Sequence, residues 1–202
     1  MTTGNTAATG VNQAGMAVDM GPPTLCEAME SQNKALREDL AADESASIKE
    51  GFGSSGATTV AHGSLTQSSP MGATSRLLPS RYDDRVVKGL WEEKDKDKRK
   101  AMRKSGESNV CPGKPFKYDQ AYRPHQSHCE SKILETLFKP GSASPAGGTL
   151  TLNINWQSSD NPNSKQPCPS CRRLLCHAQK HCEIKIELCQ KDPSDPPKPL
   201  SC

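Results

Sequence analysis

The second half of the chain carries the clearest hydrophobic pattern. Apolar and polar residues alternate strictly over 149–156 and again over 182–189, which predicts two strands with one buried face each. Apolar residues at helical spacing predict helices over 128–138 and 168–181. The resulting order is helix, strand, helix, strand. A strand–helix–strand unit of this size indicates parallel strands joined by a crossover, in a sheet with helices packed on it.

The first 82 residues have a different pattern. They are rich in Gly, Ala, Ser and Thr, and we expect most of them to be disordered. A thin apolar stripe predicts a helix over 24–41, and a Ser-, Gly- and Thr-rich stretch over 42–80 indicates a flexible linker. We expect the folded domain to span 83–190, with its first part helical around 80–104.

The tail over 191–202 is rich in proline, and we expect that it does not continue a sheet.

Composition and charge support this division. Only 33% of the 202 residues are hydrophobic and 4% aromatic, too few to bury a core over the whole length. Residues 1–82 carry 5 basic and 8 acidic side chains, and residues 83–202 carry 21 and 15, which gives net charges of −3 and +6. The basic portion slightly favours a polyanionic partner such as nucleic acid.

No apolar stretch is long enough to span a membrane, and the start of the chain has no signal-peptide pattern. Nine cysteines are many, and seven of them lie from Cys129 onward. This clustering favours metal ligands over a disulfide framework.

Two short strings contain a possible metal site. His128 lies in "SHCE" at the start of one predicted helix, and Cys168 and Cys171 lie in "PCPSC" at the start of the other. A catalytic zinc site takes three protein ligands and leaves a fourth position for water. One imidazole and two thiolates would meet this requirement if both helices packed on one sheet face with their N-termini together.

Glu130 would then lie beside the metal without binding it. A carboxylate in that position can take a proton from an attacking water and pass it to a leaving nitrogen. This chemistry is the hydrolytic deamination of a nucleobase.

The combination of "HCE" and "PCPSC" resembles the H-x-E…P-C-x-x-C signature of the cytidine deaminase superfamily. The surrounding strings "GTLTLNINW" and "PCPSCRRLLCHAQKHCEIKIELC" look like those of bacterial toxin deaminases. The resemblance covers roughly residues 83–190 and is specific at five positions. It departs from the superfamily in its short, proline-rich hairpin region and in lacking an obvious final helix and strand.

The resemblance implies a cytidine-deaminase-like α/β fold, three-layered or truncated. It implies a Zn²⁺-dependent enzyme that converts cytosine to uracil in nucleic acid, which we expect to be single-stranded DNA. It further implies an antibacterial toxin, a secreted bacterial effector that lacks a standard signal peptide, acts in the target-cell cytoplasm and is neutralised by an immunity protein. We expect a monomer.

Further residues are candidates for substrate contact. They are His125, Trp156, Ser170, Arg172 and Arg173. His125 could stack on a base, Trp156 is either core or beside the substrate, and the two arginines could reach phosphates.

Other interpretations remain open. Ser127 and Glu130 also form a capping box, so Glu130 could only cap a helix. Cys168 and Cys171 could belong to a structural zinc module with Cys176, His177, His181 or Cys182, which would bind nucleic acid or protein without catalysis. RNA, duplex DNA, a free nucleoside and adenine are alternative substrates.

Overall fold

A computed structural model describes residues 10–11, 17–18, 22–42, 59–69, 72–77, 107–108, 110–111, 113–118, 128–138, 144–156 and 164–202. Residues 78–106 and 119–127 lie outside this part of the chain, so the helix expected at 80–104, His125 and Ser127 are not described. No helix in the described part is both long and apolar enough to cross a membrane.

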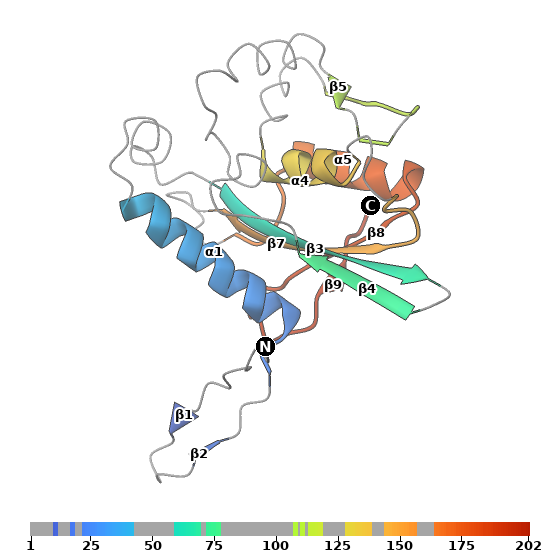
Figure 1. Cartoon of the computed structure of the whole chain (residues 1–202). Coiled ribbons are helices and arrows are strands. Elements are labelled where there is room, and N and C mark those ends of the chain that lie inside the picture. The colour runs from blue at the N-terminus through green and yellow to red at the C-terminus, as the bar shows by residue number, and fades with distance from the viewer. Residues whose placement is uncertain are drawn as a thin grey trace.

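A five-stranded mixed sheet forms the centre of the molecule (Figure 1). Its order is β4 (Gly72–Leu77), β3 (Thr59–Ser69), β7 (Thr149–Trp156), β8 (Lys185–Leu188) and β9 (Lys198–Pro199). The pair β7 and β8 is parallel, as expected, and the other neighbours are antiparallel. Short strand pairs also form between β1 (Gly10–Val11) and β2 (Ala17–Val18), and between β5 (Glu107–Ser108) and β6 (Phe116–Lys117).

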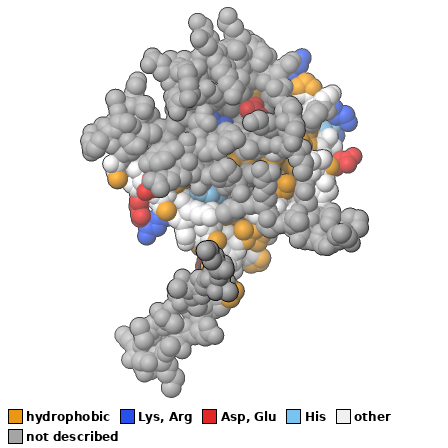
Figure 2. All heavy atoms as spheres, viewed as in Figure 1, with side chains coloured by type: hydrophobic (Ala, Val, Ile, Leu, Met, Phe, Trp, Pro, Cys, Tyr) orange, Lys and Arg blue, Asp and Glu red, His pale blue; other side chains and the backbone are white. Residues whose placement is uncertain are grey.

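Helices cover both faces of the sheet, so the fold is mixed α/β with three layers (Figure 1). Helices α4 (Cys129–Leu137) and α5 (Pro169–His181) lie on one face, and α1 (Leu25–Ala42) lies on the other. The predicted helices over 24–41, 128–138 and 168–181 are therefore confirmed to within one or two residues. The grey regions of Figure 2 correspond to residues that are not described.

Strand β3 corrects the expectation of a flexible linker over 42–80. Residues 59–69 pair with β7 from Thr59 opposite Trp156 to Thr66 opposite Thr149, and residues 72–77 form the neighbouring strand. Val60 and Ala61 are fully buried. The sheet and its core therefore include residues well before the expected domain start at residue 83.

Strand β7 is buried on both faces, not on one. Leu152 and Ile154 belong to the hydrophobic core, and the alternate residues Asn153 and Asn155 are also buried, because α1 covers their face. The polar half of the alternation therefore does not face solvent. It supplies hydrogen-bonding groups for a helix packed on the sheet.

Six of the nine cysteines form disulfides, which corrects the expectation that the cysteines chiefly bind metal. The pairs are Cys26–Cys189, Cys111–Cys182 and Cys176–Cys202. The first joins α1 to the end of β8, the second joins the β5–β6 region to the end of α5, and the third joins α5 to the segment after β9. Only Cys129, Cys168 and Cys171 remain as thiols.

The proline-rich tail also differs from expectation. Residues 198–199 pair with β8, and the Leu200 backbone N–H donates to the Ile186 carbonyl at 2.8 Å. Proline can be accommodated in an outermost strand because its missing N–H faces away from the ladder. The tail therefore adds a short fifth strand to the sheet.

Candidate metal centre

The three predicted ligands lie together at the N-terminal ends of α4 and α5. The Nδ1 atom of His128 lies 3.7 Å from the Sγ of Cys168 and 3.3 Å from the Sγ of Cys171. All three potential ligand atoms lie within 4.8 Å of one another. His128 immediately precedes α4, and Cys168 and Cys171 occupy the cap and first turn of α5.

These distances fit a tetrahedral metal ion. Zn–S bonds of about 2.3 Å and Zn–N bonds of about 2.0–2.1 Å at tetrahedral angles require sulfur and nitrogen to lie roughly 3.6 Å apart. The two observed distances between sulfur and nitrogen bracket this value. One histidine and two cysteines are also a ligand set that suits zinc among the divalent ions. The triad could therefore hold a metal ion.

The local sequence explains why the two thiols converge. Cys168 is the N-cap of α5 in an extended conformation, and its Sγ accepts a hydrogen bond from the Cys171 N–H at 3.4 Å. Pro169 follows at the first helical position, where a missing N–H costs nothing. The Cys-x-x-Cys spacing then turns both sulfur atoms to the same side of the first turn.

Electrostatics favour one thiolate even without a metal. The Cys171 thiol is the main cause that lowers the pKa of Cys168 to about 3, with smaller contributions from His128 and the Cys171 N–H. The pKa of Cys171 is raised, first because of its hydrogen bond with Cys168 and then because of burial and Glu130. The pair therefore holds one thiolate and one proton, and a bound cation would replace that proton.

Glu130 lies in the first turn of α4 and is 3% exposed. It lines a small pocket of about 30 Å³ together with His128 and Cys168. Burial is the main cause that raises the pKa of the Glu130 carboxyl. A buried carboxyl with a raised pKa that lines a pocket is a candidate general acid or base, whereas a solvated helix cap is not.

The rest of the pocket wall comes from β3, β7 and the segment before α5. Its residues are Thr59, Ile154, Trp156 and Gln166. Trp156 is half-buried and lines the pocket. Of its two expected positions, in the core or beside the substrate, the second requires this exposure to the pocket. Sequence reasoning missed Thr59 and Gln166. Thr59 lies in the stretch expected to be a linker, and Gln166 lies in a loop without a periodic signal.

Thr59 is tied to the first turn of α4. The Cys129 thiol donates to the Thr59 carbonyl at 3.0 Å and is fully buried, as expected for a core residue. This contact joins the first residue of β3 to the helix that carries Glu130. It fixes one wall of the pocket relative to the acid.

The remaining candidates for substrate contact lie elsewhere. Ser170 is 1% exposed, and its hydroxyl has no hydrogen-bond partner among the described residues. Arg172 and Arg173 are exposed, and Arg172 donates to the Ser201 carbonyl at 2.7 Å. None of the three lines the pocket.

The alternative structural zinc module does not fit. Cys176 and Cys182 are both in disulfides, so their sulfur atoms are not free to bind a metal. His177 contacts the Lys114 carbonyl at 2.8 Å, and its ring lies 4.5 Å from that of His181. These two histidines therefore pack against each other on the surface of α5. Within the described residues, only the triad of His128, Cys168 and Cys171 has the geometry of a metal site.

Comparisons with known proteins identify no relative of this chain. No protein-family model matches it, and neither do any curated protein sequences or solved structures.

Proposed function

We propose that the chain is a zinc-dependent deaminase of the cytidine-deaminase type, which hydrolyses cytosine to uracil and ammonia in nucleic acid. The observation that carries the proposal is the position of Glu130. Its carboxyl is buried in the same pocket as His128 and Cys168, two of the three candidate metal ligands. The three-layer arrangement, with both motifs at helix N-termini over one sheet face, agrees with the fold that the resemblance implies.

His128, Cys168 and Cys171 would hold the ion. Zinc bound there would supply a Lewis acid and an activated water molecule. Glu130 then acts as the proton carrier, which is the role that a raised pKa suits. Its carboxylate accepts one proton from the attacking water and delivers it to the ring nitrogen. It then carries the second water proton from the new C4 hydroxyl to the amino group, so that the C4–N bond breaks, ammonia leaves and the C4 carbonyl of uracil forms.

The pocket wall would position the base. Trp156 offers an aromatic face, and Thr59 and Gln166 offer hydrogen-bonding groups around a small cavity. A base that reaches a group in such a recess must first be removed from any stack of bases. Because this step costs least in an unpaired strand, single-stranded DNA is the proposed substrate. The toxin role, the immunity partner and the monomeric state are parts of the same proposal and depend on the resemblance alone.

Purified, zinc-loaded protein should be incubated with single-stranded DNA, duplex DNA, RNA and cytidine, and uracil should be scored by sequencing or chromatography. We expect uracil from single-stranded DNA. Glu130→Gln, which keeps the shape of the side chain, should lower turnover by about 10²–10⁴-fold and leave the bound zinc unchanged by elemental analysis.

Glu135→Gln provides the matched control on the same helix, because Glu135 does not line the pocket. Its turnover should stay within about threefold of the parent value. A parent protein that produces uracil from none of the four substrates, or a Glu130→Gln variant that is as active as Glu135→Gln, would contradict the proposal. The first result would leave a metal-binding module without catalysis, and the second would leave an enzyme that does not use Glu130.

A further inference from the structure

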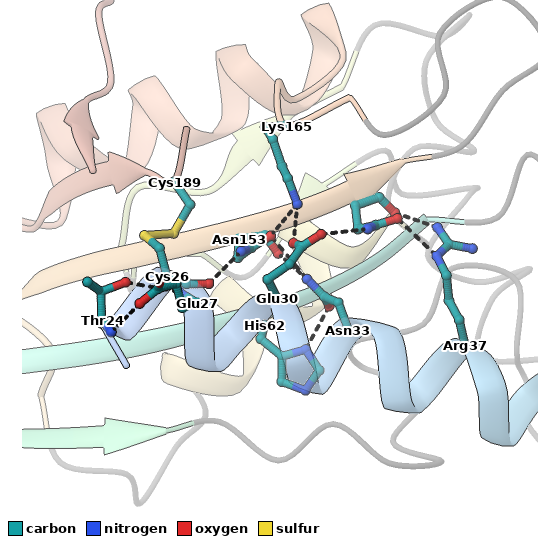
Figure 3. Close-up of polar contacts among 11 residues, drawn as sticks. Thr24, Cys26, Glu27, Glu30, Asn33, Arg37, His62, Asn153, Lys165 and Cys189 are labelled. Atoms are coloured by element: carbon teal, nitrogen blue, oxygen red, sulfur yellow. Dashed lines mark hydrogen bonds and ion pairs between the residues drawn. A yellow bond between two sulfur atoms is a disulfide. The ribbon is translucent and has the colours of Figure 1, made fainter. Parts of the chain in front are cut away.

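A buried polar network lies on the face of the sheet opposite the metal centre, between α1 and β7 (Figure 3). Asn33 donates to the backbone and side-chain oxygens of Asn153, both at 3.1 Å, and Asn153 donates to the Cys26 carbonyl at 3.1 Å. Asn33 and Asn153 have no exposed surface. Helix α1 is thus bound to β7 by specific hydrogen bonds and not only by apolar contact.

One cation in this network comes from the segment that leads into the metal centre. The Lys165 ammonium pairs with the Glu30 carboxylate of α1 and also donates to the Asn153 side chain at 3.0 Å. The Lys165 side chain is 6% exposed and that of Glu30 is 32% exposed. Figure 3 shows Lys165 pointing from its own segment across the strand toward α1.

The same segment forms part of the pocket. Gln166, next to Lys165, lines the pocket, and Cys168 follows two residues later as a ligand of the triad. On its other side, Ser164 forms two backbone hydrogen bonds with Trp156, which also lines the pocket. The contact of Lys165 with α1 therefore fixes a segment whose neighbours on both sides contribute to the site.

We propose that Glu30 and Lys165 are positioning residues of the candidate site: their ion pair holds segment 164–168 against the end of β7 and so sets the pocket wall formed by Trp156 and Gln166. This inference rests on the proposed function only for its kinetic readout. The ammonium of Lys165 is almost completely removed from water, so it needs an anionic partner to remain there. Without Glu30, Lys165 has to turn toward solvent, and the segment that carries it has to move.

A second contact holds the adjacent part of the strand. Arg37, two turns along α1 from Glu30, donates to the Asn155 side chain at 2.9 Å and to the Asn155 carbonyl at 2.7 Å. Glu30 accepts a longer bond from Asn155 at 3.5 Å. Asn155 directly precedes Trp156 in β7, so both charged side chains of α1 act on the strand end behind the pocket.

The test uses Trp156 as a reporter. The chain has two tryptophans, so a Trp91→Phe background leaves Trp156 as the only one. In this background we would compare Glu30→Gln, Lys165→Met, their double variant and Lys165→Arg. Glu38→Gln is the matched control, because it makes the same change on the same helix at an exposed ion pair with Lys34.

We expect Glu30→Gln and Lys165→Met to increase quenching of Trp156 fluorescence by acrylamide at least twofold. They should raise KM for the oligonucleotide at least tenfold and keep kcat within about threefold. The double variant should match the single variants, because both remove one interaction. Lys165→Arg and Glu38→Gln should resemble the parent. If Glu30→Gln does not fold, Glu30→Asp takes its place. Faster hydrogen exchange over 164–168 in this variant than in the parent would then report the same loosening of the segment.

Equal Trp156 quenching in Glu30→Gln, Lys165→Met and Glu38→Gln would overturn the inference, as would additive effects in the double variant. The quenching readout does not require turnover. If the parent protein produced no uracil, the proposed function would fail, while the role of the ion pair would still be decided by fluorescence.

Discussion

Trp156 and Ser164 are joined by a reciprocal pair of backbone hydrogen bonds, Trp156 N–H to Ser164 O at 3.1 Å and Ser164 N–H to Trp156 O at 2.9 Å. This bridge brings the chain back beside the end of β7 four residues before Cys168. The aromatic wall of the pocket is therefore held beside the segment that leads to the cysteine ligands.

Removing the metal should destabilise the fold. A ligand at about a thousandfold its dissociation constant adds about 4 kcal/mol to the free energy of unfolding, which corresponds to roughly 10 °C in Tm for a chain of this size. Thermal unfolding with and without a chelator checks this. Zinc should restore the Tm and magnesium should not, because thiolates bind magnesium weakly. An unchanged Tm after verified metal removal would argue against a bound ion.

The stability of the protein should fall in mild acid because of His62. Burial lowers the pKa of His62 from 6.5 to about 4. Between these pH values the unfolded chain binds a proton that the folded chain does not, so the free energy of unfolding decreases as the pH falls from 6.5 to 4. The total decrease is about 3 kcal/mol. Above pH 6.5 both states are neutral at this residue, and its contribution is constant.

The local structure explains why His62 stays neutral. Its Nδ1 lies 2.7 Å from Asn33 Oδ1, and because the Asn33 amide nitrogen is used by Asn153, the oxygen accepts from His62. Its Nε2 has no partner among the described residues. His62→Gln should remove most of the slope of stability against pH in urea titrations, and His177→Gln should keep it. Identical slopes in the two variants would refute this assignment.

The three disulfides should differ in their contribution to stability. Cys26 and Cys189 are 163 residues apart in sequence, and Cys176 and Cys202 are 26 apart. In the chain-entropy description, the longer closed loop stabilises the fold by about 1.5 kcal/mol more. Replacing both cysteines of each pair by alanine and measuring urea unfolding tests the order. The reverse order would indicate that fixing the tail contributes more to the free energy of unfolding than fixing α1.

Gly148 should not tolerate a side chain. A Cβ atom there would lie 2.9 Å from the Thr66 carbonyl oxygen and 3.0 Å from the Pro145 carbonyl oxygen, and neither backbone atom can move freely. Gly148→Ala should therefore cost about 1–3 kcal/mol, measured as a lower Tm. Ala146→Ser, in the same turn but exposed, should have little effect. A Gly148→Ala variant as stable as the parent would contradict this packing.

The sequence predicted the metal triad because both motifs have strong local signals. Proline and paired cysteines fix the start of α5, and the apolar spacing fixes α4 on the same sheet face. The alternation in β7 correctly placed Ile154 and Trp156 on the face that carries the site. The position of the two motifs in space then follows from a short crossover between parallel strands.

Strand β3 could not be predicted, because its burial depends on partners far away in sequence. Between Thr59 and Ser69 it has only Val60, Ala61 and Leu65 as apolar side chains, and its His62 is buried through Asn33 of α1. The polar face of β7 was expected to face solvent, and this was wrong because the helix that covers it, α1, is also distant in sequence. A helix with polar residues directed at the sheet has no distinctive periodicity.

The pairing of the cysteines was also beyond sequence reasoning. Six cysteines alone allow fifteen connectivities, and nothing in the spacing separates Cys176, five residues after Cys171, from the metal-binding pair. Only the fold brings Cys202 to α5 and leaves Cys171 beside His128.

The short outer strand β9 has a consequence for how copies of this protein behave in solution. It pairs with β8 opposite Glu187 and Leu188, and the N–H of the following Leu200 donates to the Ile186 carbonyl. A shortened chain that ended before Lys198 would expose this edge of β8. The unpaired backbone N–H and C=O groups of an exposed edge strand can pair with those of another copy and cause aggregation. Removal of residues 198–202 is therefore expected to promote association of copies through this edge of the sheet.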